Sequence, residues 1–205
     1  MQTIDTIIFD LGGVLIDGDP KYLYRQVFDN DEQKMNWFLG TICTNEWNLE
    51  QDAGRTLKEG TELLVEQFPT YEALIRMYYD QWTQMLGGPI SGTVALLKQL
   101  KYRNVHTIYA LTNWSAETFP QALERFDFLQ DFAGIVVSGE ERTRKPFRKI
   151  YDIILDRYQI IPEKAIFIDD NLENVETATK IGLNGIHFKN ADQLRQHLIA
   201  MGIEL

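Results

Sequence analysis

The chain has 205 residues, of which 44% are hydrophobic and 24% charged, so it is long enough for one α/β core with a small insertion and has the composition of a globular protein rather than a disordered one. Its formal net charge of -10 argues against nonspecific nucleic-acid binding and against an anionic membrane surface. An anionic substrate would therefore have to be drawn in by a bound metal or by a few local lysines and arginines.

The first predicted element is a strand at residues 6–9, an apolar run rich in β-branched residues that is typical of a strand buried on both faces. It ends on Asp10, and the glycines Gly12 and Gly13 follow, which allow a sharp turn and a close approach to a ligand. Ligands of parallel sheets bind outside the carboxyl ends of the strands, so Asp10 is a candidate functional residue. A helix cap or a plain strand-end turn is the alternative interpretation.

The next segment, expected to be a unit of residues 17–86, has apolar and aromatic residues at spacings of three and four from Lys21 to Gln84, which predicts amphipathic helices. Gly- and Pro-marked stretches lie on both sides of this helical pattern, Leu15 to Pro20 before it and Gly87 to Pro89 after it, and they have the composition of linkers. We expect a helical insertion that opens and closes over a site, as lids of enzymes do.

After the second linker, helices and strands alternate. The pattern predicts helices over 93–102, 116–126, 147–158, 172–181 and 192–201, with strands over 108–111, 135–137, 165–168 and 185–188. Strict alternation of this kind builds a parallel sheet with right-handed crossovers. Residues 1–16 and 87–205 are thus expected to form one α/β core domain, and residues 17–86 a second, all-helical one.

Three later strands also end on polar groups. Thr112-Asn113 follows one strand, Lys145 lies shortly after the next, and Asp169-Asp170 follows the third. Each group has an ordinary interpretation by itself, as a helix cap or a solvated loop lysine. Their joint occurrence at the carboxyl ends of successive strands favours a shared active site.

The acidic residues of this set predict a metal. Asp10, Asp169 and Asp170 would lie at one sheet end, where like charges raise one another's pKa unless a cation neutralises them. Oxygen ligands with no His or Cys nearby favour Mg²⁺ over Zn²⁺.

Cellular context is indicated by the single cysteine, Cys43, which cannot form an internal disulfide and fits a reducing compartment. The first residues lack the basic and apolar regions of a signal peptide, and their apolar run is too short to span a bilayer. We expect a cytoplasmic protein that binds neither membrane nor nucleic acid and is a monomer or a small homo-oligomer.

The order and spacing of these motifs resemble the haloacid dehalogenase-like (HAD) hydrolase superfamily over nearly the whole chain. Asp10 matches the nucleophile of the first motif, Thr112 the second motif, Lys145 the third and Asp169-Asp170 the acidic fourth. The resemblance implies a Rossmann-like core with a helical cap inserted after the first motif. It also implies a Mg²⁺-dependent phosphatase acting on a small phosphorylated metabolite through an aspartyl-phosphate on Asp10.

The resemblance also implies a set of site residues. The superfamily binds magnesium through the nucleophile, a main-chain carbonyl two residues later and an acid of the fourth motif, which here are Asp10, Gly12 and Asp170, with Asp169 as a further candidate. The candidate substrate-binding residues are Gly13, Arg55, Asn113 and Trp114. Arg55 belongs to the stretch Asp52-Ala53-Gly54-Arg55, which matches a cap loop that reaches toward the nucleophile.

Two positions depart from the family pattern. Most HAD phosphatases have an aspartate two residues after the nucleophile as general acid and base, and this chain has Gly12. Many relatives have an acid where this chain has Asn174, so Asp169 is expected to supply that charge. Two other functions stay open: a metal-independent 2-haloacid dehalogenase using the same Asp10, and a binding or regulatory module with little catalysis.

Overall fold

The computed structural model describes residues 3–205, and its centre is a five-stranded sheet in which every neighbouring pair is parallel. Its strands are β1 (Thr6–Phe9), β4 (Thr107–Thr112), β5 (Gly134–Val137), β6 (Ala165–Asp169) and β7 (Asn184–His187), in the spatial order β5-β4-β1-β6-β7. This arrangement confirms the predicted α/β class with a parallel sheet.

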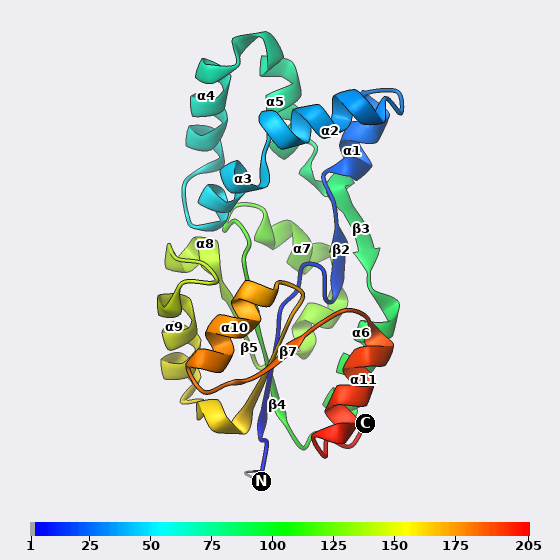
Figure 1. Cartoon of the computed structure of the whole chain (residues 1–205), viewed down its shortest axis with the longest axis vertical. Coiled ribbons are helices and arrows are strands. Elements are labelled where there is room, and N and C mark those ends of the chain that lie inside the picture. The colour runs from blue at the N-terminus through cyan, green and yellow to red at the C-terminus, as the bar shows by residue number, and fades with distance from the viewer. Residues whose placement is uncertain (1–2) are drawn as a thin grey trace.

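Helices cover both faces of the sheet because β1 is buried at every position and its side chains alternate between the faces. Ile7 and Phe9 pack in a cluster with residues of α6, α7 and α11, whereas Ile8 packs in a second cluster with residues of α9 and α10. The covering helices are α6 (Ser91–Arg103), α7 (Phe119–Arg125), α9 (Arg148–Tyr158), α10 (Leu172–Lys180) and α11 (Ala191–Ala200). Figure 1 shows α9 and α10 on one side of the sheet and α6 and α11 on the other. Shorter helices complete the core: η3 (Asp127–Asp131), α8 (Ser138–Glu141) and η4 (Pro162–Lys164).

A helical insertion separates β1 from the rest of the sheet and lies beyond the carboxyl ends of the strands (Figure 1). It consists of α1 (Lys21–Val27), α2 (Glu32–Thr41), α3 (Asn45–Asp52), α4 (Leu57–Gln67), η1 (Pro69–Tyr71), α5 (Glu72–Asp80) and η2 (Trp82–Met85). Ten buried residues of the insertion, Tyr24, Phe38 and Tyr78 among them, form a hydrophobic cluster of their own. The insertion thus has a core separate from the two clusters that cover the sheet.

The two stretches expected to be linkers pair with each other. β2 (Ile16–Gly18) and β3 (Leu86–Pro89) form a two-stranded antiparallel ribbon between the sheet and the insertion. Both expected domain boundaries fall within this ribbon. The Gly- and Pro-rich sequence of these two stretches does not predict strands. They pair because the fold of the insertion brings them side by side.

The remaining predicted elements are present with ends shifted by a few residues. The largest difference is α7, predicted from residue 116 and observed from Phe119. Within residues 3–205, none of the helices has the length and apolar character needed to cross a membrane.

Candidate active site

The strand order determines where the polar strand ends meet. From β1 the chain continues to β4 and β5 on one side of the sheet and then returns to β6 and β7 on the other. The order therefore reverses beside β1, and in open α/β sheets such a reversal opens a crevice at the carboxyl ends of the strands. Asp10 directly follows β1, and Asp169 ends the neighbouring strand β6.

Lys145 is the centre of a buried charge cluster at this edge. Its side chain is fully buried, and its Nζ lies 2.9 Å from Asp10 Oδ1 and 2.6 Å from Asp169 Oδ2. The same Nζ donates a hydrogen bond to the carbonyl oxygen of Leu111, at 2.9 Å. Burial opposes the positive charge of Lys145, but the two carboxylates outweigh it and raise the pKa of this lysine. Lys145 is therefore a fixed cation beside Asp10.

Both carboxylate oxygens of Asp169 are occupied by protein donors. Oδ1 accepts from the backbone N–H of Asn171 at 2.8 Å and from Asn174 Nδ2 at 3.0 Å, and Oδ2 accepts from Lys145. Asn174 thus holds Asp169, and Asp169 in turn holds Lys145. Asp169 therefore fits the role of positioning Lys145 more closely than the role of a metal ligand.

Carboxylate oxygens of Asp10, Asp169 and Asp170 lie within 4.8 Å of one another. Burial raises the pKa of Asp10 to about 8, with Lys145 opposing the shift and the two neighbouring aspartates adding to it. Burial and Asp169 also raise the pKa of Asp170. Crowded carboxylates of this kind fit a divalent cation with oxygen ligands. Gly13 contributes space, because its φ is +70° and a side chain there would collide with the carboxyl group of Asp170.

Two of the residues expected at the second motif are close to the cluster. Thr112 is buried at the end of β4. The side chain of Asn113 binds the main chain at Lys145 twice: Oδ1 accepts from the Lys145 N–H at 2.8 Å, and Nδ2 donates to the Lys145 carbonyl oxygen at 3.0 Å. Asn113 therefore fixes the loop that carries the lysine.

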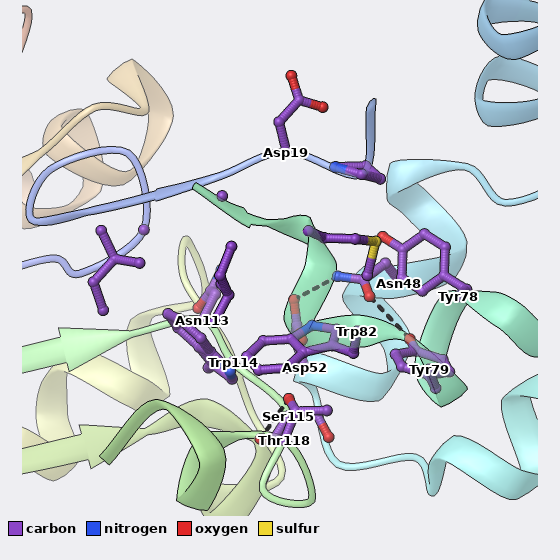
Figure 2. A pocket seen from close by; sticks show the side chains of 16 residues that line it. Asp19, Asn48, Asp52, Tyr78, Tyr79, Trp82, Asn113, Trp114, Ser115 and Thr118 are labelled. Atoms are coloured by element: carbon purple, nitrogen blue, oxygen red, sulfur yellow. Dashed lines mark hydrogen bonds between the residues drawn. The ribbon is translucent and has the colours of Figure 1, made fainter. Parts of the chain in front are cut away.

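A cavity of about 160 Å³ lies between the insertion and the sheet edge. Its lining is mostly apolar and aromatic, and it includes Gly12, Asn113 and Trp114 from the core with Tyr78, Tyr79 and Trp82 from the insertion (Figure 2). The indole Nε1 of Trp114 is buried and has no hydrogen-bond partner among the described residues.

The structure does not bring Arg55 to this cavity. Its Nε donates to Gln51 Oε1 at 2.6 Å, and its guanidinium also donates to the carbonyl oxygen of Trp47 at 3.1 Å. Arg55 lines a different hollow, on the insertion itself. Of the predicted site residues, Asp10, Lys145, Asp169 and Asp170 converge, and Gly12, Asn113 and Trp114 line the adjoining cavity.

Two polar residues of this region were not among the predicted site residues. Asp52, at the end of α3, is buried and lines the cavity. Ser138 is buried just after β5; its Oγ accepts from the Trp114 N–H at 2.9 Å and donates to the Asp52 carbonyl oxygen at 2.5 Å. The sequence offers one signal for each: Ser138 follows a predicted strand, and Asp52 opens the segment that resembles a cap loop.

Comparison with known proteins agrees with this geometry. A sequence model described as haloacid dehalogenase-like hydrolase matches residues 4–182. The chain is 31% identical to the sesquiterpene phosphatase astK of Aspergillus oryzae over 92% of both chains. It is 23% identical to a phosphorylated carbohydrates phosphatase of Thermotoga maritima, over 90% of this chain and 84% of that protein. Among solved structures, a HAD family enzyme of Bacteroides thetaiotaomicron in a magnesium complex has a TM-score of 0.71, with 22% identity over 97% of this chain and 99% of that one.

Proposed function

The chain belongs to the haloacid dehalogenase-like hydrolases, and we propose that it is a Mg²⁺-dependent phosphatase of a small organic phosphate monoester. The observation that carries this proposal is the cluster at the sheet edge. There Lys145 forms ion pairs with both Asp10 and Asp169, and a carboxylate oxygen of Asp170 lies close to theirs. Two relatives that match most of the chain are named as phosphatases. The magnesium in the related solved structure agrees with the oxygen donors found here.

Asp10 is the proposed nucleophile. Its Oδ1 is held by Lys145 and by the backbone N–H of Leu11, at 2.7 Å, so the carboxylate is fixed in one orientation. Attack of an Asp10 oxygen on phosphorus forms an aspartyl-phosphate, which water then hydrolyses. In this proposal Lys145 stabilises the negative charge on the transferring group, and the Thr112 hydroxyl, with nearby backbone amides, would bind phosphoryl oxygens.

Asp10, Asp170 and the main-chain carbonyl of Gly12 are the residues that would hold Mg²⁺. The bound ion would supply positive charge to the phosphoryl oxygens and neutralise the crowded carboxylates. Asp169 has a different role in this proposal, because its two oxygens already accept from Lys145, Asn171 and Asn174.

The organic part of the substrate is proposed to occupy the cavity under the insertion. A cavity of about 160 Å³ has room for a group of about the size of one ring, since an engineered cavity of ~150 Å³ holds benzene. The aromatic side chains of Trp114, Tyr78 and Trp82 would form apolar walls around this group. In this proposal the helical insertion at residues 17–86 is a cap, and movement about the β2–β3 ribbon lets substrate enter.

The test is a hydrolysis screen of purified protein on p-nitrophenyl phosphate, phenyl phosphate, sugar phosphates and 2-chloropropionate, with Mg²⁺ and with EDTA. The proposal expects Mg²⁺-dependent release of phosphate and no release of chloride. Metal-independent chloride release would instead show a dehalogenase. Absence of turnover on every phosphate ester would contradict the proposal and favour a binding role for the fold.

A further inference from the structure

The proposed phosphatase lacks an acid on the core side of its cavity. Gly12 has no side chain, and a Cβ placed on it would meet no atom within 4 Å. Nevertheless, the oxygen that leaves with the organic group must receive a proton unless the leaving group is a stable anion. A proton donor for this oxygen should therefore lie elsewhere around the cavity that Gly12 lines.

Asp52 is the acidic residue of the insertion that is buried in the cavity wall. Its Oδ2 accepts a hydrogen bond from Asn48 Nδ2 at 2.9 Å, and Asn48 Oδ1 accepts one from the Tyr79 hydroxyl at 2.9 Å. Figure 2 shows this chain of contacts, with Asp52 beside Trp82 and Trp114. The carboxyl group thus has a defined orientation in an apolar wall.

The main chain around Asp52 is fixed to the sheet edge. The carbonyl oxygen of Asp52 accepts from Ser138 Oγ, which follows β5. Two residues later, Gly54 has a φ of +99°, and a Cβ there would lie 3.0 Å from the carbonyl oxygen of Gly139. This contact requires the absence of a side chain at Gly54, and it holds the end of α3 directly against the core. Asp52 therefore keeps its position relative to the strand ends that carry the reaction.

The surroundings of Asp52 favour its protonated form. Burial raises the pKa of Asp52 to about 7, against the opposing effects of the Ser115 backbone N–H and the positive charge of Arg144. The other titratable groups that interact with it, Tyr78 and Tyr79, are uncharged because burial raises the pKa of both phenols. A carboxyl group with a pKa near neutrality is suited both to give and to take a proton.

We propose that Asp52 is the general acid and base of this enzyme, in place of the missing side chain at Gly12; this rests on the proposed phosphatase function. In the first step an Asp10 oxygen forms a bond to phosphorus and the bond from phosphorus to the ester oxygen breaks. The electron pair stays on the ester oxygen, which takes the proton of Asp52 and leaves as an alcohol. In the second step Asp52 takes a proton from water, the resulting hydroxide attacks phosphorus, and the Asp10 carboxylate leaves.

The experiment compares two esters of nearly equal shape. p-Nitrophenolate leaves as a stable anion, whereas phenolate is more basic and needs a proton. We measure kcat/KM, which reports the steps up to transfer of the phosphoryl group to Asp10. In Asp52→Asn, kcat/KM for phenyl phosphate is expected to fall about 100-fold or more, the low end for general acid catalysis. The value for p-nitrophenyl phosphate is expected to fall far less, by under about tenfold.

Two further variants complete the design. Glu50→Gln neutralises an exposed carboxylate on the same helix and should leave both values unchanged. Gly12→Asp in the Asp52→Asn background places an acid in the open space at Gly12 and should restore much of the activity on phenyl phosphate. This rescue is a result that a merely structural role of Asp52 would not produce.

The outcomes separate the two proposals. If the wild-type protein hydrolyses neither ester, the proposed function itself fails. If it hydrolyses both and Asp52→Asn lowers both values equally, or lowers neither, Asp52 is not the proton donor. A wild-type enzyme that hydrolyses only p-nitrophenyl phosphate also overturns the inference, because such an enzyme has no working acid.

Discussion

Burial raises the pKa of an aspartate on each side of the cavity, to about 8 for Asp10 and to about 7 for Asp52, but the neighbours of the two carboxyl groups differ. At the sheet edge Asp10 and Asp169 are paired with Lys145, a buried cation that favours their charged forms. On the insertion side Asp52 accepts a hydrogen bond from the neutral amide of Asn48. The first side, the charged side, therefore carries its own cation, whereas on the second, the proton-holding side, the hydrogen-bonding side chain is neutral.

This difference shows how one fold can separate two tasks. Stabilising a phosphoryl group needs charges that are fixed in place. Burying such charges costs desolvation free energy, and an opposite charge beside each one offsets that cost. Proton transfer needs a group whose charge changes near the working pH, which an apolar wall supplies by desolvation. Each side, and the connection between them, can be perturbed separately by substitution or by metal.

Replacing Asp10 with Asn should have the largest effect, because it removes the proposed nucleophile. We expect kcat/KM for p-nitrophenyl phosphate to fall at least about 1,000-fold. Asp80→Asn, an exposed change at the end of α5, is the matched control and should leave the rate unchanged. Substantial activity in folded Asp10→Asn protein would remove the charged side from the mechanism.

Lys145→Met should cause the largest loss of stability. The lysine is fully buried, and its removal leaves Asp10 and Asp169 close together without a counter-ion. Breaking a buried ion pair in this way costs about 3–5 kcal/mol, which urea unfolding would measure. Lys149→Met, an exposed change on α9, should alter the unfolding free energy by less than about 0.5 kcal/mol. Equal effects of the two substitutions would mean that the cluster does not depend on its lysine.

Magnesium should stabilise the charged side and leave the proton-holding side unaffected. At 100 times its dissociation constant, a ligand bound only by the folded protein adds about 2.7 kcal/mol to the unfolding free energy. We expect Mg²⁺ to raise the melting temperature of the wild-type protein and of Asp52→Asn, and to have little effect on Asp170→Asn. Asp192→Asn, an exposed aspartate on α11, serves as control. A magnesium shift that persists in Asp170→Asn would place the ion elsewhere.

The charged side could be predicted from the sequence because each of its residues lies at or near a strand end. An apolar run followed by a polar residue locates Asp10, Thr112 and Asp169 without knowledge of the packing. The strand order then brings these positions together, as the alternation of helices and strands predicts.

The proton-holding side could be located only as a segment. The sequence of residues 52–55 resembles a loop near the nucleophile and predicts that Arg55 reaches the substrate. The structure ends α3 at Asp52 and turns at Gly54, so that Arg55 runs back along the helix to Gln51 and Trp47. Which side chain faces the cavity depends on helix phase and on packing against the core, and neither is contained in the local pattern.

Asp52→Asn should make the protein more stable at the same time as it impairs catalysis. The folded-state pKa of about 7 lies above the unfolded value, so the wild-type protein loses stability as the pH rises from about 4 to about 7. An amide at this position has no charge to bury and can still accept from Asn48. At pH 8 we expect the variant to be more stable by up to about 4 kcal/mol, which is the free energy of a pKa shift of about three units. The gap should close at pH 4, and Glu50→Gln should show no such gap. A destabilised variant at pH 8 would mean that the Asp52 carboxylate is stabilised by its surroundings.

The smallest effect is expected where the two sides meet, at Ser138. Its hydroxyl binds the Trp114 N–H of the core and the Asp52 carbonyl oxygen of the insertion. Ser138→Ala leaves both groups without this partner, which costs about 1 kcal/mol of unfolding free energy. Because the variant loosens the main chain of Asp52, kcat/KM should fall more for phenyl phosphate than for p-nitrophenyl phosphate. Ser91→Ala, an exposed change at the start of α6, should alter neither quantity. If Ser138→Ala lowers both rates equally, the hydroxyl acts through Trp114 and the cavity wall, and the position of Asp52 does not depend on it.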